Sequence, residues 1–426
     1  MTKRFLWMMA ATVMTSTTLP AAPSVTSVSF AQENDGPRTV TVNYTLANEA
    51  AIITMDVLTN NFSIGDENIH FLEGDVNRLV QPGSRQIKWY AQKSWPNRKV
   101  DESTVTVRVS AWSQQKPPDY MVVDLETPNS VTYYTSTNAL PDGGLGNNLY
   151  KTSRLVMKFV EAAGETYTMG FAGYTSGQHA THSATLSKDY YIGIYTITQA
   201  QWKRIIGWYP SYNYNQGADV RMVYPVQYTA YNEIREVAPV DDNVPINKQY
   251  GQNGQKDVVG DATYAYPADP APASWLGRLS SHAGIKFDLP SECEWEYACR
   301  AGNYGAKWGD GSAYLGTSAD ANLARIGRYA GNSDNHIWPV GSLAPNSWGI
   351  YDMHGNLWEW CVDFFNTDIT SLYGAVDTRT NGVKRTERGG GYHKTADGCN
   401  SGYRTSDLGN TRYEKVGFRV VSRIEP

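Results

Sequence analysis

The sequence predicts two domains: an all-β sandwich followed by a larger α+β domain with little regular secondary structure. The chain has 426 residues, too many for one ordinary hydrophobic core but enough for two domains. Apolar and polar residues alternate in short runs over residues 23–126, as they do in half-buried strands. Residues 151–426 contain only two segments with clear helix-start signals and are otherwise rich in Gly and Asn.

Residues 1–22 have the three-part layout of a secretory signal peptide. Lys3 and Arg4 give a basic start, Phe5–Val13 is an apolar run, and Leu19–Ala22 offers small residues for cleavage. The apolar run is shorter than the ~20 residues that a membrane span requires, and no later segment reaches that length. A net charge of −5 over this length gives no electrostatic footprint for nucleic acid. We therefore expect an exported protein, secreted or periplasmic, with no membrane span and no nucleic-acid partner.

Residues 23–126 are predicted to form the sandwich, because their alternating runs are separated by Gly, Pro, Asn and Asp. The pattern resembles that of immunoglobulin-like domains. Residues 127–150 hold Pro, Gly, Asn, Ser and Thr without an apolar period, and they are predicted to be a linker. The alternating runs are Val40–Leu46, Ile53–Val57, Ile87–Trp89 and Val105–Val109.

Two helices are predicted in residues 151–426, each opened by a capping box. Thr198–Gln201 begins one helix, which runs to Gly207, and Ser291–Glu294 begins the other. The remainder holds scattered short strands, with Ala238–Ser274 as one long variable loop. Glu294 and Glu296 are better explained by capping and buried pairing than by acid–base chemistry.

Five separated segments of this second domain match, in order, the motifs of one known family. They are YTMG (Tyr167–Gly170), ITQAQW (Ile197–Trp202), LPSECEWEYACRAG (Leu289–Gly302), GIYDMHGNLWEWC (Gly349–Cys361), and RGGGY (Arg388–Tyr392) leading to GFRVV (Gly417–Val421). Together they resemble the formylglycine-generating enzyme, or sulfatase-modifying-factor, family. The resemblance implies that residues 151–426 form an α+β domain of C-type-lectin-like fold.

The resemblance also implies two calcium sites. The first falls on Asn322 and Leu323, with the stretch Asn332–Asp334 nearby. The second falls on Asp352, Gly355, Leu357 and Glu359, with Gly355 and Leu357 contributing backbone carbonyls. Calcium prefers such oxygen ligands. Clusters of Asn, Gly and Asp also form ordinary turns, so turn chemistry is the alternative.

The enzyme of this family oxidises a sulfatase cysteine to formylglycine, using copper held by two cysteine thiolates. Motif position places the second of these cysteines at Cys399, with Trp358 in the same site, but the first at Lys394. A protonated lysine has no lone pair to give a metal, so a copper site is doubtful. Candidate catalytic residues are reduced to Cys399 and Trp358. Three more positions depart from the family: Gly391 for Ser, Thr395 for His and Lys415 for Asn.

The four cysteines of an exported chain predict disulfides. Cys293 and Cys299 share the second predicted helix six residues apart, ~9 Å along its axis, so they cannot pair with each other. Each could pair with Cys361 or Cys399 instead. A metal site built from the cysteines is disfavoured, because the sequence has no CxxC.

Two functions follow. The first is an exported module that binds a protein or a glycan through a loop-built surface rich in Tyr and Trp, without the two-cysteine oxidase site. The alternative is an enzyme, a formylglycine-generating oxidase or a divergent oxidoreductase that modifies an exported sulfatase-like partner.

Overall fold

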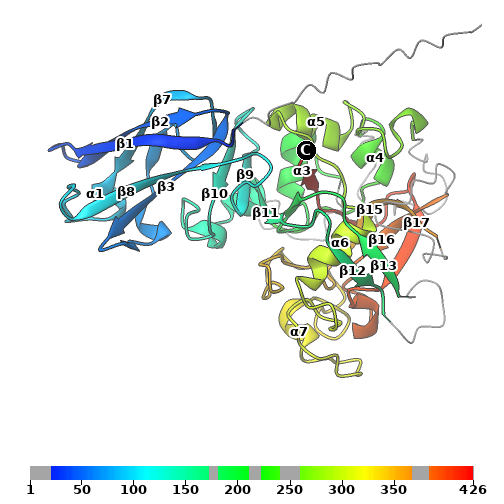
Figure 1. The fold of residues 1–426 in the computed structure, drawn as a ribbon. Coiled ribbons are helices and arrows are strands. Elements are labelled where there is room, and N and C mark those ends of the chain that lie inside the picture. Colours follow the sequence, from blue (N-terminus) through cyan, green and yellow to red (C-terminus); the bar gives the residue numbers. More distant parts are fainter. Residues whose placement is uncertain (1–20, 172–180, 211–221, 240–259, 367–382, 426) are drawn as a thin grey trace, which may run out of the picture.

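The computed structural model describes residues 21–171, 181–210, 222–239, 260–366 and 383–425. The N-terminal domain lies beside the larger C-terminal domain, in blue to cyan and in green to red respectively (Figure 1). Nearly all of the predicted signal peptide and the middle of the predicted loop 238–274 lie outside the described residues. No helix of the described part is long and apolar enough to cross a membrane.

The N-terminal domain is a sandwich of two sheets around one hydrophobic core. Its strands alternate as predicted: Val40, Val42, Tyr44 and Leu46 are buried and pack with residues of the second sheet such as Val57. This confirms the all-β sandwich. One sheet has the order β1 (Ser24–Gln32), β2 (Thr39–Ala47), β7 (Gly83–Tyr90), β5 (Leu72–Gly74); the other has β4 (Phe62–Ser63), β3 (Ala51–Thr59), β6 (Leu79–Val80), with β8 (Val105–Trp112) paired to β3. The domain also contains η1 (Asp66–Asn68) and α1 (Ala91–Ser94).

The C-terminal domain is built on two sheets and a separate hairpin, with helices and long loops between them. The described strands bear out the predicted α+β class with little regular secondary structure. The first sheet has the order β10 (Val131–Tyr134), β9 (Tyr120–Asp124), β11 (Arg154–Val160), β14 (Tyr190–Gly193), β19 (Val421–Arg423); the second has β17 (Arg404–Leu408), β16 (Lys384–Arg388), β15 (Trp358–Phe364), β18 (Val416–Gly417); the hairpin is β12 (Thr166–Met169) with β13 (His182–Thr185).

Strands β9 and β10 lie in the first sheet of the C-terminal domain, although the predicted bounds placed β9 in the sandwich domain and β10 in the linker. Antiparallel pairing sets Val123 opposite Leu155 and Met121 opposite Met157. The last sandwich strand therefore ends at Trp112, and residues 120–150 form part of the second domain, including η2 (Gly144–Gly146) and α2 (Leu149–Thr152). Residues 120–124 (YMVVD) do not alternate, and a local sequence pattern does not show which sheet a segment joins.

Both predicted helices form, and each has its capping box. Thr198 and Gln201 bond reciprocally at the start of α3 (Gln199–Ile206), and Ser291 and Glu294 do so at the start of α6 (Glu292–Arg300). The sequence did not predict α5 (Trp275–Ala283). Its third position is Gly277, which cannot complete a capping box, and a Cβ there would lie 2.0 Å from the Ala271 carbonyl oxygen. The shorter elements are α4 (Tyr231–Arg235), η3 (Ala262–Tyr264), α7 (Leu323–Ile326) and η4 (Ala396–Cys399).

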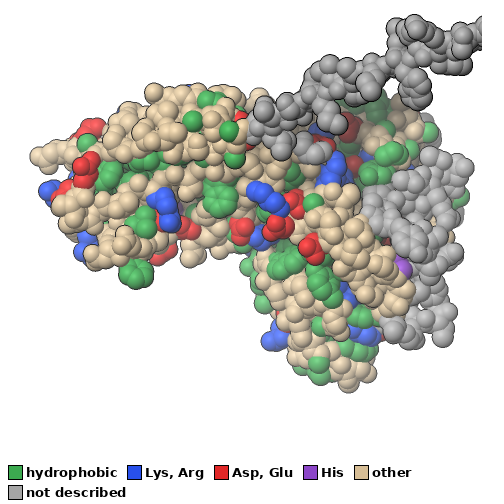
Figure 2. Space-filling view, viewed as in Figure 1, with side chains coloured by type: hydrophobic (Ala, Val, Ile, Leu, Met, Phe, Trp, Pro, Cys, Tyr) green, Lys and Arg blue, Asp and Glu red, His purple; other side chains and the backbone are tan. Residues whose placement is uncertain are grey.

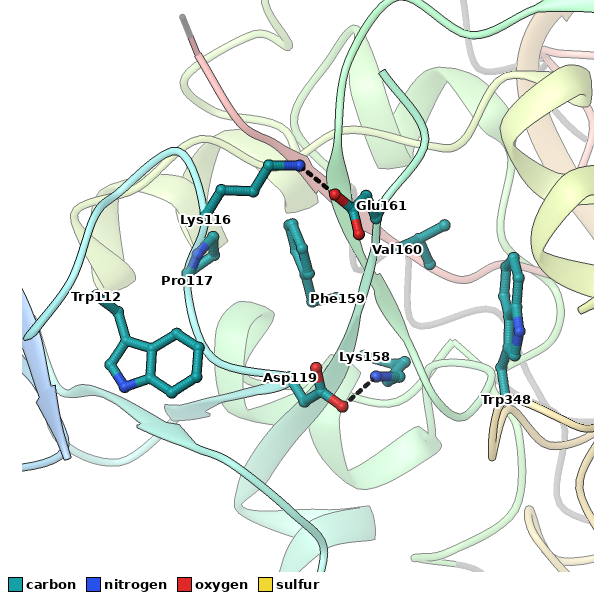
Figure 3. Close-up of a pocket in the computed structure, with 9 residues that line it drawn as sticks. All are labelled: Trp112, Lys116, Pro117, Asp119, Lys158, Phe159, Val160, Glu161 and Trp348. Carbon is teal, nitrogen blue, oxygen red and sulfur yellow. Dashed lines mark hydrogen bonds and ion pairs between the residues drawn. The ribbon is translucent and has the colours of Figure 1, made fainter. Parts of the chain in front are cut away.

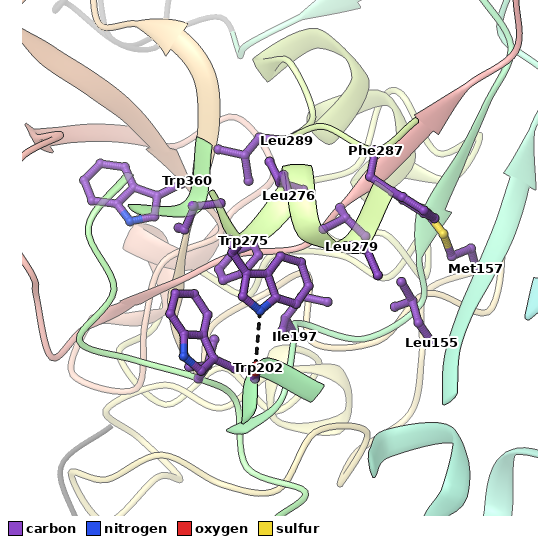
Figure 4. Packing of buried hydrophobic residues seen from close by; sticks show 14 of the residues in the cluster. Leu155, Met157, Ile197, Trp202, Trp275, Leu276, Leu279, Phe287, Leu289 and Trp360 are labelled. Atoms are coloured by element: carbon purple, nitrogen blue, oxygen red, sulfur yellow. Dashed lines mark hydrogen bonds between the residues drawn. The ribbon is translucent and has the colours of Figure 1, made fainter. Parts of the chain in front are cut away.

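A cluster of aromatic side chains holds the helices against the sheets. The rings of Trp202 in α3 and Trp275 in α5 stack with centroids 5.9 Å apart, and Phe418 meets Trp275 edge-on at 5.1 Å. Trp202 and Trp275 belong to the same buried cluster as Leu155 and Met157 of β11, and in Figure 4 Ile197 and Leu279 lie between the two pairs. Edge-on and offset rings add to the stability gained from burial. The core therefore joins β11, both helices and the C-terminal segment.

A truncation test follows from the position of β9 and β10. A fragment of residues 113–426 should fold cooperatively, whereas residues 151–426 should aggregate or melt at a lower temperature. Removing β9 exposes the buried side chains of Leu155 and Met157 and leaves one edge of β11 unpaired, while its other edge stays paired with β14. Thermal unfolding followed by circular dichroism compares the two fragments. Equal melting temperatures would show that β9 and β10 are dispensable.

Candidate functional site

The two candidate catalytic residues meet at the glycine turn that follows β16. Trp358 is the first residue of β15, and Cys399 is the last residue of η4. The Cys399 thiol lies 3.8 Å from the Gly391 carbonyl oxygen, and a Cβ on Gly391 would lie 3.6 Å from Cδ1 of Trp358. The tertiary structure thus brings Cys399 and Trp358 to one turn, although 40 residues of sequence separate them.

The glycines of this turn are required by its backbone and by close packing. Gly389 and Gly390 have φ of 95° and 78°, a region that other residues rarely adopt. A Cβ on Gly390 would lie 2.6 Å from the sulfur of Cys399. The turn therefore covers Cys399 directly with backbone, and a side chain at residue 390 would displace the thiol.

Cys399 is held as a neutral thiol. Its side chain is fully buried, and burial raises its pKa to about 12, although the Gly391 carbonyl and the charge of Lys394 act in the opposite direction. The thiolate is the form that attacks electrophiles and binds copper. Near neutral pH this cysteine therefore has little nucleophile or ligand character.

Lys394 and His393 occupy the rest of the turn. The Lys394 amine lies 5.7 Å from the centre of the Trp358 ring, and its Cβ lies 3.3 Å from where a Cβ of Gly398 would be. Lys394 is therefore packed beside Cys399, at the place where the family resemblance puts the first cysteine. His393 has its pKa lowered to about 4 by burial and by Lys415 and Lys394, so its ring is neutral near pH 7. The arrangement supplies one thiol and one imidazole rather than two thiolates.

Glu387 is a residue of this region that the sequence did not reveal. It lies in β16 with 1% of its surface exposed, and one of its carboxylate oxygens has no hydrogen-bond partner. Burial raises the pKa of Glu387 well above its usual range, and the nearby charge of Asp407 adds to the effect. Four consecutive residues of β16 are buried, so the strand has no alternation that could have singled Glu387 out.

The expected disulfides are not formed, and the four cysteines are free and buried. Cys293, Cys299 and Cys361 belong to one hydrophobic cluster and Cys399 to another. The Cys293 sulfur lies 3.7 Å from the sulfur of Met169. The prediction from cysteine count is therefore corrected: in the structure the side chains serve as small apolar core residues.

The second predicted calcium site does not fit the residues as they are arranged, because both oxygens of Glu359 are already bound. Oε1 accepts from Thr196 Oγ1 and Arg419 Nη2, each at 2.7 Å. Oε2 accepts from Trp295 Nε1 at 2.7 Å and Arg419 Nε at 2.6 Å. A cation at Glu359 would have to displace the Arg419 guanidinium, which already carries the compensating charge.

The other residues of that set are divided among different contacts. Asp352 accepts a 2.7 Å bond from the Gly341 amide, and burial raises its pKa to about 6. A Cβ on Gly355 would lie 2.0 Å from the Arg328 carbonyl oxygen, and Leu357 is buried in the core. Within the described residues, no group of three or more His, Cys, Asp and Glu side chains could hold a metal ion.

At the first predicted calcium site, the polar side chains form hydrogen bonds to backbone groups within the local loops. Asp320 accepts from the amides of Leu315, Asn322 and Leu323 at 2.7–3.0 Å. The Asn322 side chain donates to the Ala313 carbonyl at 2.8 Å, and Asn332 Oδ1 accepts from the Tyr329 amide at 2.9 Å. These contacts are those expected from the alternative of turn chemistry.

The glutamates of α6 form buried ion pairs, as predicted for Glu294 and Glu296. Glu294 completes the capping box and pairs with Arg423 at 2.7 Å, and Glu296 pairs with Arg300 and Arg388. Glu292 pairs with Arg404. These side chains therefore connect α6 to β16, β17 and β19, and none is available as an acid or base.

The profile of the Sulfatase-modifying factor enzyme 1-like domain family matches residues 150–424. The chain therefore belongs to this family, and the resemblance seen in the five motifs is confirmed. The C-terminal domain is the family domain.

Individual relatives match over shorter stretches. Formylglycine-generating enzymes of Streptomyces coelicolor and Thermomonospora curvata are 34% and 30% identical over 35% of this chain, which corresponds to 48% and 51% of those proteins. The match thus spans about half the length of these relatives. The chaperone protein LppX of Paenibacillus barcinonensis is 23% identical over 58% of this chain and 84% of its own length.

Two solved structures are similar over 63% of the chain. Treponema denticola variable protein 1 has a TM-score of 0.48 at 24% identity and is covered to 95%. PvdO from Pseudomonas aeruginosa has a TM-score of 0.47 at 22% identity and is covered to 94%.

The Glu359–Arg419 pair can be tested by removing one charge. Glu359→Gln should destabilise the protein by ~3–5 kcal/mol, because it leaves a buried guanidinium without its counter-ion. Asp269→Asn is the matched control, since the Lys286–Asp269 pair is exposed and should contribute little. Denaturant unfolding measures both variants. Equal, small effects would show that the buried pair does not hold the domain together.

A thiol titration with Ellman's reagent, carried out without reductant at any stage, tests whether the cysteines are free. The native protein should react slowly, because all four thiols are buried and protonated near neutral pH. After denaturation in guanidinium, all four should react. A count of two or none in the denatured protein would reinstate the disulfides.

Proposed function

We propose that this protein is an exported binding module of the sulfatase-modifying-factor family that does not generate formylglycine. The observation that carries the proposal is that Lys394 and Cys399 lie next to each other at the glycine turn. Lys394 stands beside Cys399 where two thiolates would be needed, and Cys399 itself is buried as a neutral thiol. Export is supported by the signal-peptide layout of residues 1–22.

The chemistry of the turn supports a role without copper oxidation. Cu(I) is selected by soft thiolate ligands, and a protonated lysine offers it no lone pair. His393 provides one neutral imidazole, and its Nδ1 is buried without a hydrogen-bond partner. One imidazole and one protonated thiol do not make the two-thiolate site that the family chemistry uses.

The relatives support a domain that serves more than one purpose. Two of them are named formylglycine-generating enzymes, whereas the relative matched over 84% of its length is named a chaperone, which is a binding function. The names of these relatives therefore associate similar sequences with both a catalytic and a binding function. A loop-built domain joined to a β-sandwich suits the binding of an exported protein or glycan.

The competing activity has a direct assay. The protein is co-expressed with a sulfatase that carries its cysteine motif, and the motif peptide is weighed by mass spectrometry. We expect the cysteine to remain unconverted, since Lys394 replaces one of the two copper ligands. An authentic formylglycine-generating enzyme serves as the positive control. Conversion that is lost in Cys399→Ser would overturn the proposal and establish the oxidase.

A further inference from the structure

A pocket of about 450 Å³, open to solvent, lies at the junction of the two domains (Figure 3). Trp112 at the end of β8 forms one wall, and β11 with the following residue forms the floor. Trp348, from the loop before β15, closes the other side. The volume lies within the range of about 300–1,000 Å³ that small-molecule sites occupy. The pocket is separate from the glycine turn at Cys399, because none of its lining residues belongs to that turn.

Three aromatic rings line the pocket, and each is held by a contact outside it. Trp112 Nε1 donates to Thr54 Oγ1 at 2.8 Å, which fixes its indole. Phe159 packs on Tyr191 at 5.4 Å, and Trp348 packs edge-on against Tyr297 at 5.4 Å between ring centres. In Figure 3, Phe159 lies between the two tryptophans. All three rings are partly exposed, so the pocket presents rigid apolar faces to solvent.

Two ion pairs lie on opposite sides of this row of rings (Figure 3). Lys116 contacts Glu161 at 2.5 Å, and Lys158 contacts Asp119 at 2.7 Å. The lining holds two lysines and two acids, and Lys116 also contacts the carboxylate of Asp189, which is not part of the lining. In the space-filling view, basic and acidic side chains lie next to each other where the domains meet (Figure 2). The pocket therefore offers hydrogen-bond donors and acceptors, and each charge of its lining is paired with an opposite charge, so no unpaired charge favours an ion of either sign.

We propose that this pocket binds a neutral oligosaccharide. This inference rests on the proposed binding function and adds to it the class of ligand and the place where the ligand binds. One face of a pyranose ring carries C–H groups that pack on aromatic rings, while its hydroxyls both donate and accept hydrogen bonds. Charged side chains form stronger hydrogen bonds to hydroxyls than neutral ones do. Rings flanked by two neutralised ion pairs match both properties of a neutral sugar.

The pocket also gives the sandwich a role, because neither domain forms it alone. The connection between the domains is anchored at this point: Tyr191 Oη donates to the Pro118 carbonyl at 2.5 Å, and Lys116 also contacts Asp189 at 3.0 Å. These contacts fix Trp112 relative to β11. The sandwich thus supplies one wall of a site whose other walls belong to the family domain.

The inference is tested by isothermal titration of the full chain with maltotriose, cellotriose, mannotriose and triacetylchitotriose. At least one should bind, and Trp112→Ala and Trp348→Ala should each lower its affinity by about 3- to 10-fold, the effect of losing one aromatic contact. Phe62→Ala is the control, since this exposed ring lies on β4, outside the pocket lining. Circular dichroism verifies that the variants fold.

Charge selection gives a second criterion. Fully deacetylated chitotriose, which has the same rings but carries positive charge, should bind more weakly than triacetylchitotriose, and trigalacturonate should also bind weakly. The inference is overturned if no neutral sugar binds, if binding survives both tryptophan substitutions, if the charged sugars bind equally well, or if an unglycosylated peptide binds in the pocket instead. The sugar-binding measurements do not depend on whether formylglycine forms. The sulfatase assay therefore tests the proposed function separately.

Discussion

The C-terminal domain depends on one buried carboxylate, that of Glu359. It lies in β15 and accepts bonds from Arg419, Trp295 and Thr196, so that the strand, the segment after β18, helix α6 and the segment before α3 meet at one group. Arg419 extends the contact to the carbonyls of Gly193 and Tyr351. A domain with short strands and long loops has few backbone ladders to fix its parts. A bidentate guanidinium–carboxylate pair supplies that fixation, because its geometry is satisfied in only one arrangement.

The same device is repeated around α6. Its three glutamates face arginines from β16, β17 and β19, and other buried pairs join Glu233 to Arg412 and Asp288 to Arg235. Each pair has lost its water, so its Coulomb energy mostly offsets desolvation and adds little net stability. We interpret these pairs as determinants of which segments meet. This explains why glutamates and arginines are prominent in segments that would otherwise be read as candidate acids and bases.

The buried ion pairs of the domain and its glycine turn are built from different residues. The pairs made by Glu359 and by α6 maintain the domain, while the glycine turn carries Gly391, Lys394 and one buried cysteine. The cysteine is accessible to neither solvent nor a second thiolate. The pocket between the domains lies elsewhere, and its walls come from residues outside the shared motifs. The binding proposed for this pocket would therefore leave the framework on which the fold depends undisturbed.

The sequence alone determined the features that rest on local patterns. The sandwich strands, the capping boxes at Thr198 and Ser291, and the family motifs were all predicted, because alternation and capping are properties of neighbouring residues. Tertiary structure decided the rest. Strand β9 lies within the predicted bounds of the sandwich, yet it pairs with β11 of the C-terminal domain. The family resemblance implies that Glu359 is a calcium ligand, but in the structure its carboxylate pairs with Arg419. Nothing in the sequence pattern distinguishes Glu387 before its burial is known. The four cysteines suggested disulfides, but their partners are core side chains. In each case the residue that determines the outcome is distant in the sequence from the residue it contacts. Only folding brings the two together, so that charge or packing can act between them.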